Sequence, residues 1–525
     1  MSNEIASIGD ITRVHAAARG AKTALSYEDR SWTYSELDSE ANRVAQALLA
    51  AGVEPQDRVA FLDKNTAEYF PFLFGAGKVN AVTVAVNWRL APPEMEYILG
   101  NAAAKVLLIG DEFLEHLEKM DLPSVTTTIV IGSGGGLTAY GDWLAQQPDE
   151  DPLVPSGPDD TCYQLYTSGT TGLPKGVELT NENFFSMLPA ACGEWYFDED
   201  SVNLVAMPLF HIAGSGWGVV GLYNGGSNVL LRDIDPAAIL KLIPEHGITN
   251  ALLVPAVLQF LLMTPGIDAT DFSSMRAMVY GASPITEEVL VGSMKAMGCK
   301  FVQAYGLTET TGGVTILRAD DHDPGGPRAD LLRSAGKPWG DVEIRIVDTA
   351  TGQDRPDGEV GEIWCRTIQN MKGYWADERA TDLAFPEGKG EDGRGWFTTG
   401  DAGYLRDGYL YIHDRVKDMI VSGAENIYPA EIENVLMAHP EIADAAVIGV
   451  PDEKWGETVK AIITPAADAA PSDEAIIAYT RENLAHYKCP TSIDRVEVIP
   501  RNPSGKILKT ELRKPYWEGH DRMVN

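Results

Sequence analysis

Residues 166–176 read Tyr166-Thr167-Ser168-Gly169-Thr170-Thr171-Gly172-Leu173-Pro174-Lys175-Gly176, directly after an apolar run at residues 161–166. Glycines let backbone N–H groups close around an anion, hydroxyl groups add donors, and a lysine adds positive charge. A Walker A loop requires G-x-x-x-x-G-K-[ST], whereas Lys175 is followed by Gly176. The composition therefore predicts a loop that holds a polyphosphate in another way. A flexible glycine-threonine linker is the plainer alternative.

Length, charge and cysteine content limit the class of protein. A chain of 525 residues predicts two or more domains, and a hydrophobic content of 44% suffices for large cores. The net charge of −34 repels nucleic acid and anionic lipid head groups, so an anionic substrate needs local positive charge. Five dispersed cysteines without a C-x-x-C pair disfavour a disulfide framework or zinc knuckle. With no signal segment or spanning apolar run, we expect a cytoplasmic protein.

Strand-like and helix-like segments alternate in the middle of the chain, which predicts an α/β fold of mostly parallel sheets covered by helices. The expected strands are residues 202–207, 227–231, 251–254, 275–280 and 300–305. Helices are expected from Pro236, after an Asp235 cap, to Gly247, and from Ser283-Pro284 to Gly298.

The last third of the chain changes pattern. Residues 342–411 alternate short β runs with Asp-Gly turns, which predicts a small β-barrel-like part. Mixed α/β patterns return beyond the charged run at residues 414–417, with a helix starting at Pro429. We therefore predict a large N-terminal domain, residues 1–414, and a small α+β C-terminal domain, residues 415–525.

Four loops follow expected strands, at residues 167–175, 208–211, 281–283 and 306–309. In open parallel sheets, ligand sites form beyond the carboxyl ends of strands, so these loops are expected to converge. Tyr305 is suited to stacking on an aromatic base, and the carboxylate of Glu309 to Mg²⁺ beside phosphates. A helix N-terminus with Thr308 as the cap and Glu309 in its first turn remains the alternative.

Several single residues carry weaker signals. Asp401 suits a pair of ribose hydroxyls but also suits a turn. The charged run at residues 414–418 fits either a hinge or a solvated surface. Lys506, in a glycine-containing loop, could reach an anion or could be an exposed turn lysine. His211 is either a functional histidine or a packed core residue.

One motif is typical of a different function, the binding of a dinucleotide. Residues 216–221 match G-x-G-x-x-G, the fingerprint of dinucleotide-binding folds. The motif does not directly follow its strand, because residues 208–215 intervene, so we interpret its glycines as allowing close helix packing. Neither G-x-S-x-G nor H-E-x-x-H occurs, and hydrolase and metalloprotease functions therefore lack support.

Together these motifs resemble the adenylate-forming superfamily, which includes acyl-CoA synthetases, luciferases and the adenylation domains of peptide synthetases. The resemblance spans the chain from Trp32 to Lys506 and rests on five spaced motifs in the family's order. The sequence is most similar to bacterial fatty-acid–CoA ligases and to aryl or alicyclic acid–CoA ligases, through residues 87–90, 422–433 and 451–457. It departs from many relatives at Ala424, where they have a second glycine.

The resemblance implies a role for each matching residue. The implied catalytic residues are Lys506, Glu309 and Thr308, with Mg²⁺ held by Thr167 and Glu309. ATP or AMP would be bound by Thr167, Ser168, Gly169, Thr170, Thr171, Gly172, Lys175, Gln303, Ala304, Tyr305, Gly306, Thr308, Asp401, Arg415 and Lys506. The acid pocket would include His211, Trp217, Gly281, Ala282 and Gly306, and the coenzyme A channel Ser422, Gly423 and Ala424. Lys417 matches the hinge about which relatives rotate the small domain.

The implied reaction has two halves: a carboxylate attacks the α-phosphate of ATP, releasing pyrophosphate, and coenzyme A then attacks the acyl-adenylate. Medium- or long-chain fatty acids are the first expectation for the acid, with aryl and alicyclic acids as alternatives. A carrier-protein-dependent adenylation domain and a non-catalytic nucleotide-binding protein are rival functions. The net charge of −34 disfavours membrane docking through a basic patch. The oligomeric state stays open, a homodimer included.

Overall fold

The computed structural model describes residues 5–134, 136–167, 173–415, 418–422, 425–452, 454–467, 469–501 and 507–518. The fold divides into two compact units. Unit 1 consists of Met1–Leu332, Pro338–Glu343 and Arg366–Phe397, and unit 2 of Arg333–Lys337, Ile344–Cys365 and Thr398–Asn525. Both contain sheets and helices, as the predicted α/β class requires.

The first sheet of unit 1 carries the predicted polyphosphate loop. Its strand order is β19 (Gly373–Tyr374), β9 (Lys175–Thr180), β8 (Thr161–Thr167), β4 (Val82–Ala85), β3 (Arg58–Leu62), β5 (Val106–Gly110), β6 (Thr127–Ile131) and β7 (Thr138–Ala139). From β8 to β7 all pairs are parallel, while β9 runs antiparallel to both its neighbours. β3, β4 and β5 are buried along their whole length, as expected for parallel strands covered on both faces.

The second sheet of unit 1 contains the other expected strands. It runs through β15 (Gly312–Leu317), β14 (Lys300–Leu307), β13 (Ala277–Gly281), β12 (Asn250–Leu253), β10 (Val202–Val205), β11 (Ser227–Leu230), β1 (Thr23–Tyr27) and β2 (Arg30–Thr33). The pairs from β14 to β1 are parallel, and β15 and β2 are antiparallel additions. The short strand β16 (Lys337–Pro338) follows β15 along the chain.

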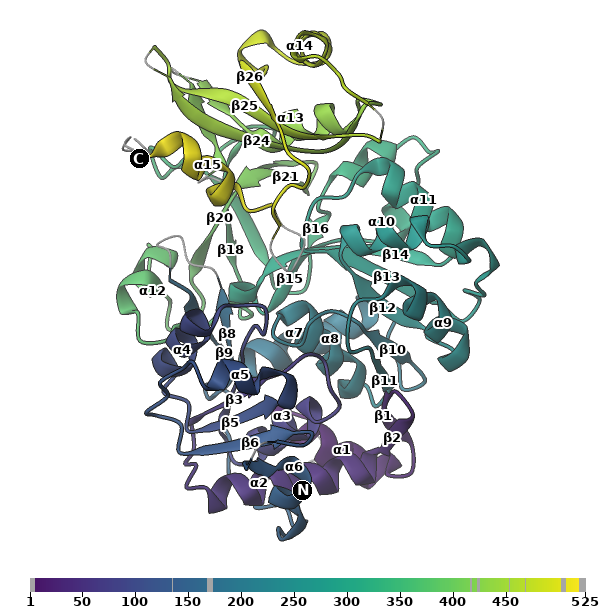
Figure 1. Ribbon diagram of the computed structural model, residues 1–525, viewed down its shortest axis with the longest axis vertical. Coiled ribbons are helices and arrows are strands. Elements are labelled where there is room, and N and C mark those ends of the chain that lie inside the picture. The colour runs from purple at the N-terminus through teal and green to yellow at the C-terminus, as the bar shows by residue number, and fades with distance from the viewer. Residues whose placement is uncertain are drawn as a thin grey trace. The chain divides into compact units, whose positions relative to one another are not determined.

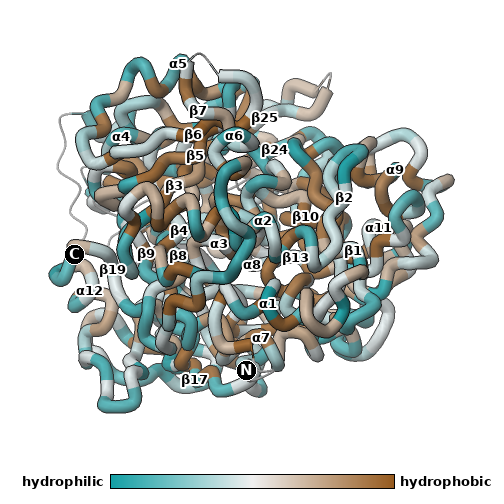
Figure 2. The backbone as a smooth tube through the Cα atoms, turned by 90° about the horizontal axis from the view of Figure 1, so that it is seen from below, coloured by the Kyte–Doolittle hydropathy of each residue, from teal (hydrophilic) through white to brown (hydrophobic). Residues whose placement is uncertain are grey.

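Helices cover these sheets. They are α1 (Ile8–Arg19), α2 (Tyr34–Ala50), α3 (Tyr69–Lys78), α4 (Pro92–Asn101), α5 (Leu114–Leu117), α6 (Tyr140–Ala145), α7 (Asn181–Glu194), α8 (Ile212–Tyr223), α9 (Pro236–His246), α10 (Pro255–Met263), α11 (Glu287–Met297) and α12 (Glu378–Ala384). Figure 1 shows α9, α10 and α11 beside β12, β13 and β14, and these elements share one apolar core. In Figure 2, β3, β5 and β6 form a brown, hydrophobic layer. Burial of these apolar faces supplies the main favourable free energy of folding.

Unit 2 contains two sheets. β17 (Glu343–Val347), β18 (Gly361–Arg366), β20 (Trp396–Arg406) and β21 (Tyr409–Arg415) form an open sheet of four strands in this order. The second sheet comprises β22 (Ile420–Ser422), β23 (Glu425–Ile427), β24 (Ile442–Asp452), β25 (Gly456–Pro465) and β26 (Ser492–Arg495), with α13 (Pro429–Met437), α14 (Asp473–Asn483) and α15 (Lys509–Trp517). The first sheet groups with the C-terminal residues, and a domain boundary at 414/415 stays a prediction.

Local signals set most element ends, with two corrections. α9 begins and ends as predicted, because the Asp235 side chain accepts from Ala237 N and Gly247 is left-handed with φ 63°. The helix expected from Ser283-Pro284 begins at Glu287 instead, because Thr286 caps it through Val289 N. The short β runs form one four-stranded sheet.

The second correction concerns the strand expected at residues 300–305, which extends to Leu307. Its last residues pair with β15, with Gly306 opposite Gly313 and Leu307 opposite Gly312. The hairpin was not expected, because residues 312–317 gave no signal that they pair with this strand. Thr308 and Glu309 therefore follow a strand within a hairpin.

The G-x-G-x-x-G motif lies inside α8, where its glycines allow close packing. A Cβ atom at Gly218 would come within 2.6 Å of Phe70 Cζ, and one at Gly221 would collide with Asn228 Oδ1. The packing interpretation is thereby confirmed for these two glycines.

Candidate active site

The predicted polyphosphate loop connects β8 to β9. At its base, Thr167 pairs with Lys175 in antiparallel register, so the hydroxyl and the lysine stem start from adjacent strands. Ser168, Gly169, Thr170, Thr171 and Gly172 lie outside the described residues. The ends of the loop thus bring together two of the side chains predicted to bind the nucleotide.

Glu309 lies beside this base, although it comes from the other sheet. Thr167 Oγ1 donates to Glu309 Oε1 at 3.0 Å, and the hydroxyl of Tyr374 donates to the same oxygen at 3.1 Å. The glutamate is only 8% exposed. A buried carboxylate needs hydrogen-bond donors or a cation, and two donors converge on Oε1. The carboxylate and the Thr167 hydroxyl together offer the oxygen ligands that Mg²⁺ prefers.

The backbone around Glu309 holds this orientation. Thr308, Glu309 and Thr310 make a single 3₁₀ turn, and Thr311 follows with φ 58°. Thr310 Oγ1 accepts from Leu307 N at 2.9 Å and donates to Gly312 O at 2.7 Å, which closes the turn. Met371 N also donates to the carbonyl of Glu309 at 2.7 Å. A three-residue turn is not a helix N-terminus, so the alternative in which Thr308 caps a helix is wrong.

Tyr374 was not expected at this site. It ends β19, which pairs with β9, and its ring centroid lies 5.0 Å from Lys175 Nζ. The only sequence signal is the aromatic pair Tyr374-Trp375 after a glycine. The strand is two residues long, so nothing local predicts that it joins the first sheet.

Arg58 contacts the residue that follows β19, and the sequence did not predict a role for this arginine either. Its guanidinium carbon lies 3.4 Å from the Trp375 ring centroid, in a cation–π contact. The same guanidinium donates to Glu178 Oε1 at 2.9 Å and to Gln164 Oε1 at 3.0 Å, which links β3, β8, β9 and the residue after β19. One buried arginine therefore ties together the strands that carry Thr167, Lys175 and Tyr374.

Gln303, Ala304 and Tyr305 lie on β14, which leads to this turn. Tyr305 is buried, and Gln303 and Ala304 are partly exposed. Gln303 Oε1 is a buried atom for which no described residue supplies a hydrogen-bond donor. These three residues lie on the strand that ends beside Glu309.

His211 and Trp217, predicted to contact the acid, lie at the start and in the middle of α8. His211 Nδ1 accepts from Ala213 N at 3.2 Å, so the imidazole caps the helix, and burial lowers the pKa of this histidine. Neutral imidazole is therefore favoured. Trp217 Nε1 donates to Leu204 O at 3.1 Å, and its ring packs against Trp195 and Phe197.

The remaining predicted acid contacts are backbone positions. A Cβ atom at Gly281 would collide with the carbonyl of Ala304, and one at Gly306 with the carbonyl of Gly312. Ala282, directly after β13, has φ 64°, a conformation that costs free energy for any residue with a Cβ atom. The strand ends β13 and β14 thus lie side by side with no side chain between them.

Unit 2 holds the other predicted residues. Asp401 is 6% exposed on β20, and its backbone pairs with that of Arg415 on β21. Ser422 ends β22, where it pairs with Gly456. Lys417, Gly423, Ala424 and Lys506 lie outside the described residues. The predicted ribose residues are therefore brought together by one hairpin.

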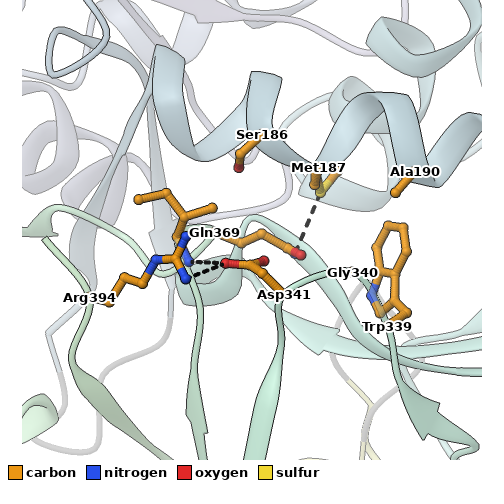
Figure 3. A pocket seen from close by; sticks show the side chains of 9 residues that line it. Ser186, Met187, Ala190, Trp339, Gly340, Asp341, Gln369 and Arg394 are labelled. Atoms are coloured by element: carbon orange, nitrogen blue, oxygen red, sulfur yellow. Dashed lines mark hydrogen bonds and ion pairs between the residues drawn. The ribbon is translucent and has the colours of Figure 1, made fainter. Parts of the chain in front are cut away.

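A pocket of about 240 Å³ opens beside α7 and is drawn in Figure 3. Arg394 Nη1 and Asp341 Oδ2 form an ion pair across it at 3.3 Å, and Gln369, which also lines it, donates to Gly313 O at 3.0 Å. None of the residues predicted from the sequence lines this pocket.

Among the residues that the structure describes, no three His, Cys, Asp or Glu side chains group as metal ligands. No helix in the described part of the chain combines the length and apolarity needed to cross a membrane. A divalent cation here would depend on few protein oxygens, as is usual for Mg²⁺ bound with phosphates.

Known proteins resemble this chain along its length. Residues 12–375 match the model described as "AMP-binding enzyme", and residues 431–506 match "AMP-binding enzyme C-terminal domain". A fatty acid–[acyl-carrier-protein] ligase from Streptomyces coeruleorubidus is 40% identical, covering 99% of both chains. A long-chain-fatty-acid–CoA ligase from Mycobacterium tuberculosis is 37% identical, covering 93% of this chain and 94% of its own. The solved structure of an anthranilate CoA ligase with anthranoyl-AMP matches with a TM-score of 0.87 at 29% identity, covering 97% of each chain.

Proposed function

Since this chain belongs to the AMP-binding enzyme family, we propose that it is an ATP-dependent carboxylic acid:coenzyme A ligase that forms AMP. One observation carries the proposal: Thr167, at the base of the glycine-threonine loop, donates at 3.0 Å to the buried carboxylate of Glu309. This contact joins a phosphate-binding motif to a metal-binding carboxylate from another sheet. A flexible linker would not require a hydrogen bond from its base to a buried carboxylate.

Residues with complementary chemistry hold the nucleotide in this proposal. The loop at residues 167–175 binds the β- and γ-phosphates through backbone N–H groups, hydroxyl groups and Lys175. Thr167 and Glu309 hold Mg²⁺, which neutralises phosphate charge when bound. Tyr305 flanks the adenine, and Asp401 and Arg415 bind the ribose hydroxyls, as the family resemblance implies. The nucleotide is also bound by Gln303, Ala304, Gly306 and Thr308.

The first half-reaction makes the acyl-adenylate. An oxygen of the substrate carboxylate attacks the α-phosphorus, the bond from phosphorus to the bridging oxygen breaks, and pyrophosphate leaves. Two anions must meet in this step, so a positioned positive charge stabilises the developing charge. That role falls to Lys506, by its match to the family motif. The loop thus holds the group that leaves and not one that is transferred.

The second half-reaction makes the thioester. The thiolate of coenzyme A attacks the acyl carbon, the carbon–oxygen bond of the mixed anhydride breaks, and AMP leaves. Ser422, Gly423 and Ala424 line the path of the thiol. The C-terminal domain, residues 415–525, turns about Lys417 between the two half-reactions.

The acid is a medium- or long-chain fatty acid, with aryl and alicyclic acids as the alternative. His211, Trp217, Gly281, Ala282 and Gly306 bound its pocket. The supporting observations are the apolar, aromatic surroundings of Trp217 and the 37% identity to a long-chain-fatty-acid–CoA ligase. The alternative is supported by the structural match to an anthranilate CoA ligase.

A second acceptor is favoured by one specific observation. The relative that is 40% identical along almost the whole chain is a ligase for an acyl-carrier protein. The phosphopantetheine arm of a carrier and that of coenzyme A present the same thiol. The acyl group of the adenylate would then be transferred to the thiol of a carrier protein, with release of AMP, and not to the free coenzyme.

Product analysis tests the function. We expect AMP and pyrophosphate from ATP only when a fatty, aryl or alicyclic acid is present, and a thioester only when a thiol acceptor is added. Coenzyme A and a phosphopantetheinylated acyl-carrier protein serve as parallel acceptors, and mass spectrometry identifies the thioester. ATP binding without AMP formation, for every acid tested, would instead support a non-catalytic nucleotide-binding protein.

A further inference from the structure

Three tryptophans cluster next to the predicted acid pocket. The Trp195 ring centroid lies 5.5 Å from that of Trp217 and 5.8 Å from that of Trp339. All three side chains are buried. Trp217 Nε1 donates to Leu204 O at 3.1 Å and Trp339 Nε1 donates to Gly313 O at 2.9 Å.

Trp195 differs from its two neighbours. Trp195 is 4% exposed, and its Nε1 atom is buried without a hydrogen-bond partner among the residues that the structure describes. A buried N–H group without an acceptor loses its hydrogen bonds to water and forms none in their place, which costs free energy. Such groups are rare in folded proteins, so this donor calls for an acceptor that arrives with a ligand.

The indole of Trp195 lies beside Gly313, a backbone position on β15. A Cβ atom at Gly313 would lie 3.9 Å from Trp195 Cζ2, the ring atom that shares a bonded carbon with Nε1. Gly313 pairs with Gly306, which is itself assigned to the acid. The indole therefore lies near the strand that pairs with a residue predicted to contact the acid.

Gly313 presents no side chain to the indole at this point. The Cβ position at Gly313 is 3.5 Å from Ala304 Cβ and 3.9 Å from Trp195 Cζ2, which are ordinary van der Waals distances. A β-carbon on residue 313 would thus lie against the indole without a collision. At Gly306, by contrast, a Cβ atom would collide with the carbonyl of Gly312.

We propose that Trp195 is a specificity-determining residue whose indole N–H binds an oxygen acceptor on the acid. This inference rests on the proposed acid activation and narrows its substrate class. The preferred acid carries a carbonyl, hydroxyl or ether oxygen partway along an otherwise apolar skeleton. The aromatic walls formed by Trp195 and Trp217 suit the apolar part, and the N–H fixes the position of the oxygen. A site built to hydrogen-bond a substrate group discriminates against the analogue that lacks it.

Matched pairs of acids test the proposal. Each pair consists of an alkanoic acid and an acid of equal length in which one methylene is replaced by an ether oxygen or a carbonyl, at successive positions. For the wild type, we expect kcat/KM for AMP formation to favour the oxygenated acid by about tenfold or more at one position. Equal kcat/KM within every pair would overturn the proposal.

Two variants locate the effect. Trp195→Phe keeps an aromatic ring and removes the N–H, so the preference at that position is expected to fall to about one. Trp339→Phe is the matched control, because it removes an N–H that already serves Gly313 O, and it should change both acids of a pair equally. An unchanged preference in Trp195→Phe contradicts the assignment.

A third variant covers the case in which Trp195→Phe does not fold. Gly313→Ala places a methyl group beside the indole without a collision, and should abolish the same preference. A preserved preference would exclude Trp195 as the donor. If no acid of either series yields AMP, the proposed function itself fails. If both series are turned over equally, only the Trp195 proposal fails.

Discussion

The proposed nucleotide side and the proposed acid side of unit 1 are built from different contacts. On the nucleotide side, the carboxylate of Glu309 accepts two hydrogen bonds, from Thr167 and Tyr374. On the acid side, glycine backbones approach closely at Gly281 and Gly306, and the Trp195 donor is one for which no described group serves as acceptor. The nucleotide side therefore has its hydrogen-bonding groups in place before a ligand binds, whereas recognition on the acid side depends on the shape of the pocket. Changes on the nucleotide side should lower kcat/KM equally for every acid, and changes on the acid side should alter the ranking of acids.

Glu309→Gln should have the largest effect. The amide oxygen still accepts from Thr167 and Tyr374, but the negative charge that favours Mg²⁺ is lost. We expect kcat/KM for pyrophosphate release to fall by about 100-fold or more, by a similar factor for each acid. Glu115→Gln, at an exposed position on α5, is the control and should leave the rate unchanged. A loss that varies strongly between acids would place Glu309 on the acid side.

Gly306→Ala should destabilise the protein, whereas Gly313→Ala should not. The added methyl group at Gly306 meets the backbone of Gly312, which cannot rotate away, while the one at Gly313 fits. Overpacking of this kind costs about 1–3 kcal/mol of unfolding free energy. Urea unfolding of both variants provides the measurement. Equal stability of the two variants would show that the hairpin between β14 and β15 is more open than described.

Tyr374→Phe should have a smaller effect of the same kind as Glu309→Gln. It removes one hydrogen bond to the carboxylate and leaves the ring near Lys175. Loss of a hydrogen bond to a charged group predicts a fall of about 10-fold in kcat/KM for ATP. Steady-state kinetics with ATP varied, repeated with two acids, should give the same factor for both. An unchanged KM and kcat for ATP would remove Tyr374 from the site.

His211→Asn should have the smallest effect, seen in stability against pH. Burial lowers the pKa of His211 below its usual 6.5, so the unfolded state binds a proton that the folded state does not. The free energy of unfolding should therefore fall as the pH drops below about 6.5, by at most ~1.4 kcal/mol per pH unit from this group. Asparagine keeps the helix cap without titrating. Urea unfolding at several pH values should show a shallower slope in the variant, and an identical slope would contradict the assignment.

The sequence predicted what depends on local chemistry. The loops at residues 167–175 and 306–309 were expected to converge because polar and glycine residues directly follow apolar strands, and Thr167 does lie 3.0 Å from Glu309. Asp235 and Gly247 marked both ends of α9 correctly, because a cap and a left-handed glycine act within a few residues.

What the sequence did not predict depends on contacts between distant segments. Tyr374 and Arg58 reach the site through strand pairing and a cation–π contact, and neither lies in a motif. The start of α11 was misplaced because Thr286 outcompeted Ser283 as a cap. The sequence could not indicate a role for Trp195, because that role depends on which of three clustered indole N–H groups has no acceptor among the described residues.

We propose that the glycine-threonine loop and Glu309 serve reversible formation of an acyl-adenylate. Exchange of labelled pyrophosphate into ATP, measured without any thiol acceptor, reports on this half-reaction alone. We predict exchange that requires the acid and is lost in Glu309→Gln. ATP cleavage to ADP and phosphate, or an absence of acid-dependent exchange with every acid class tested, would contradict it.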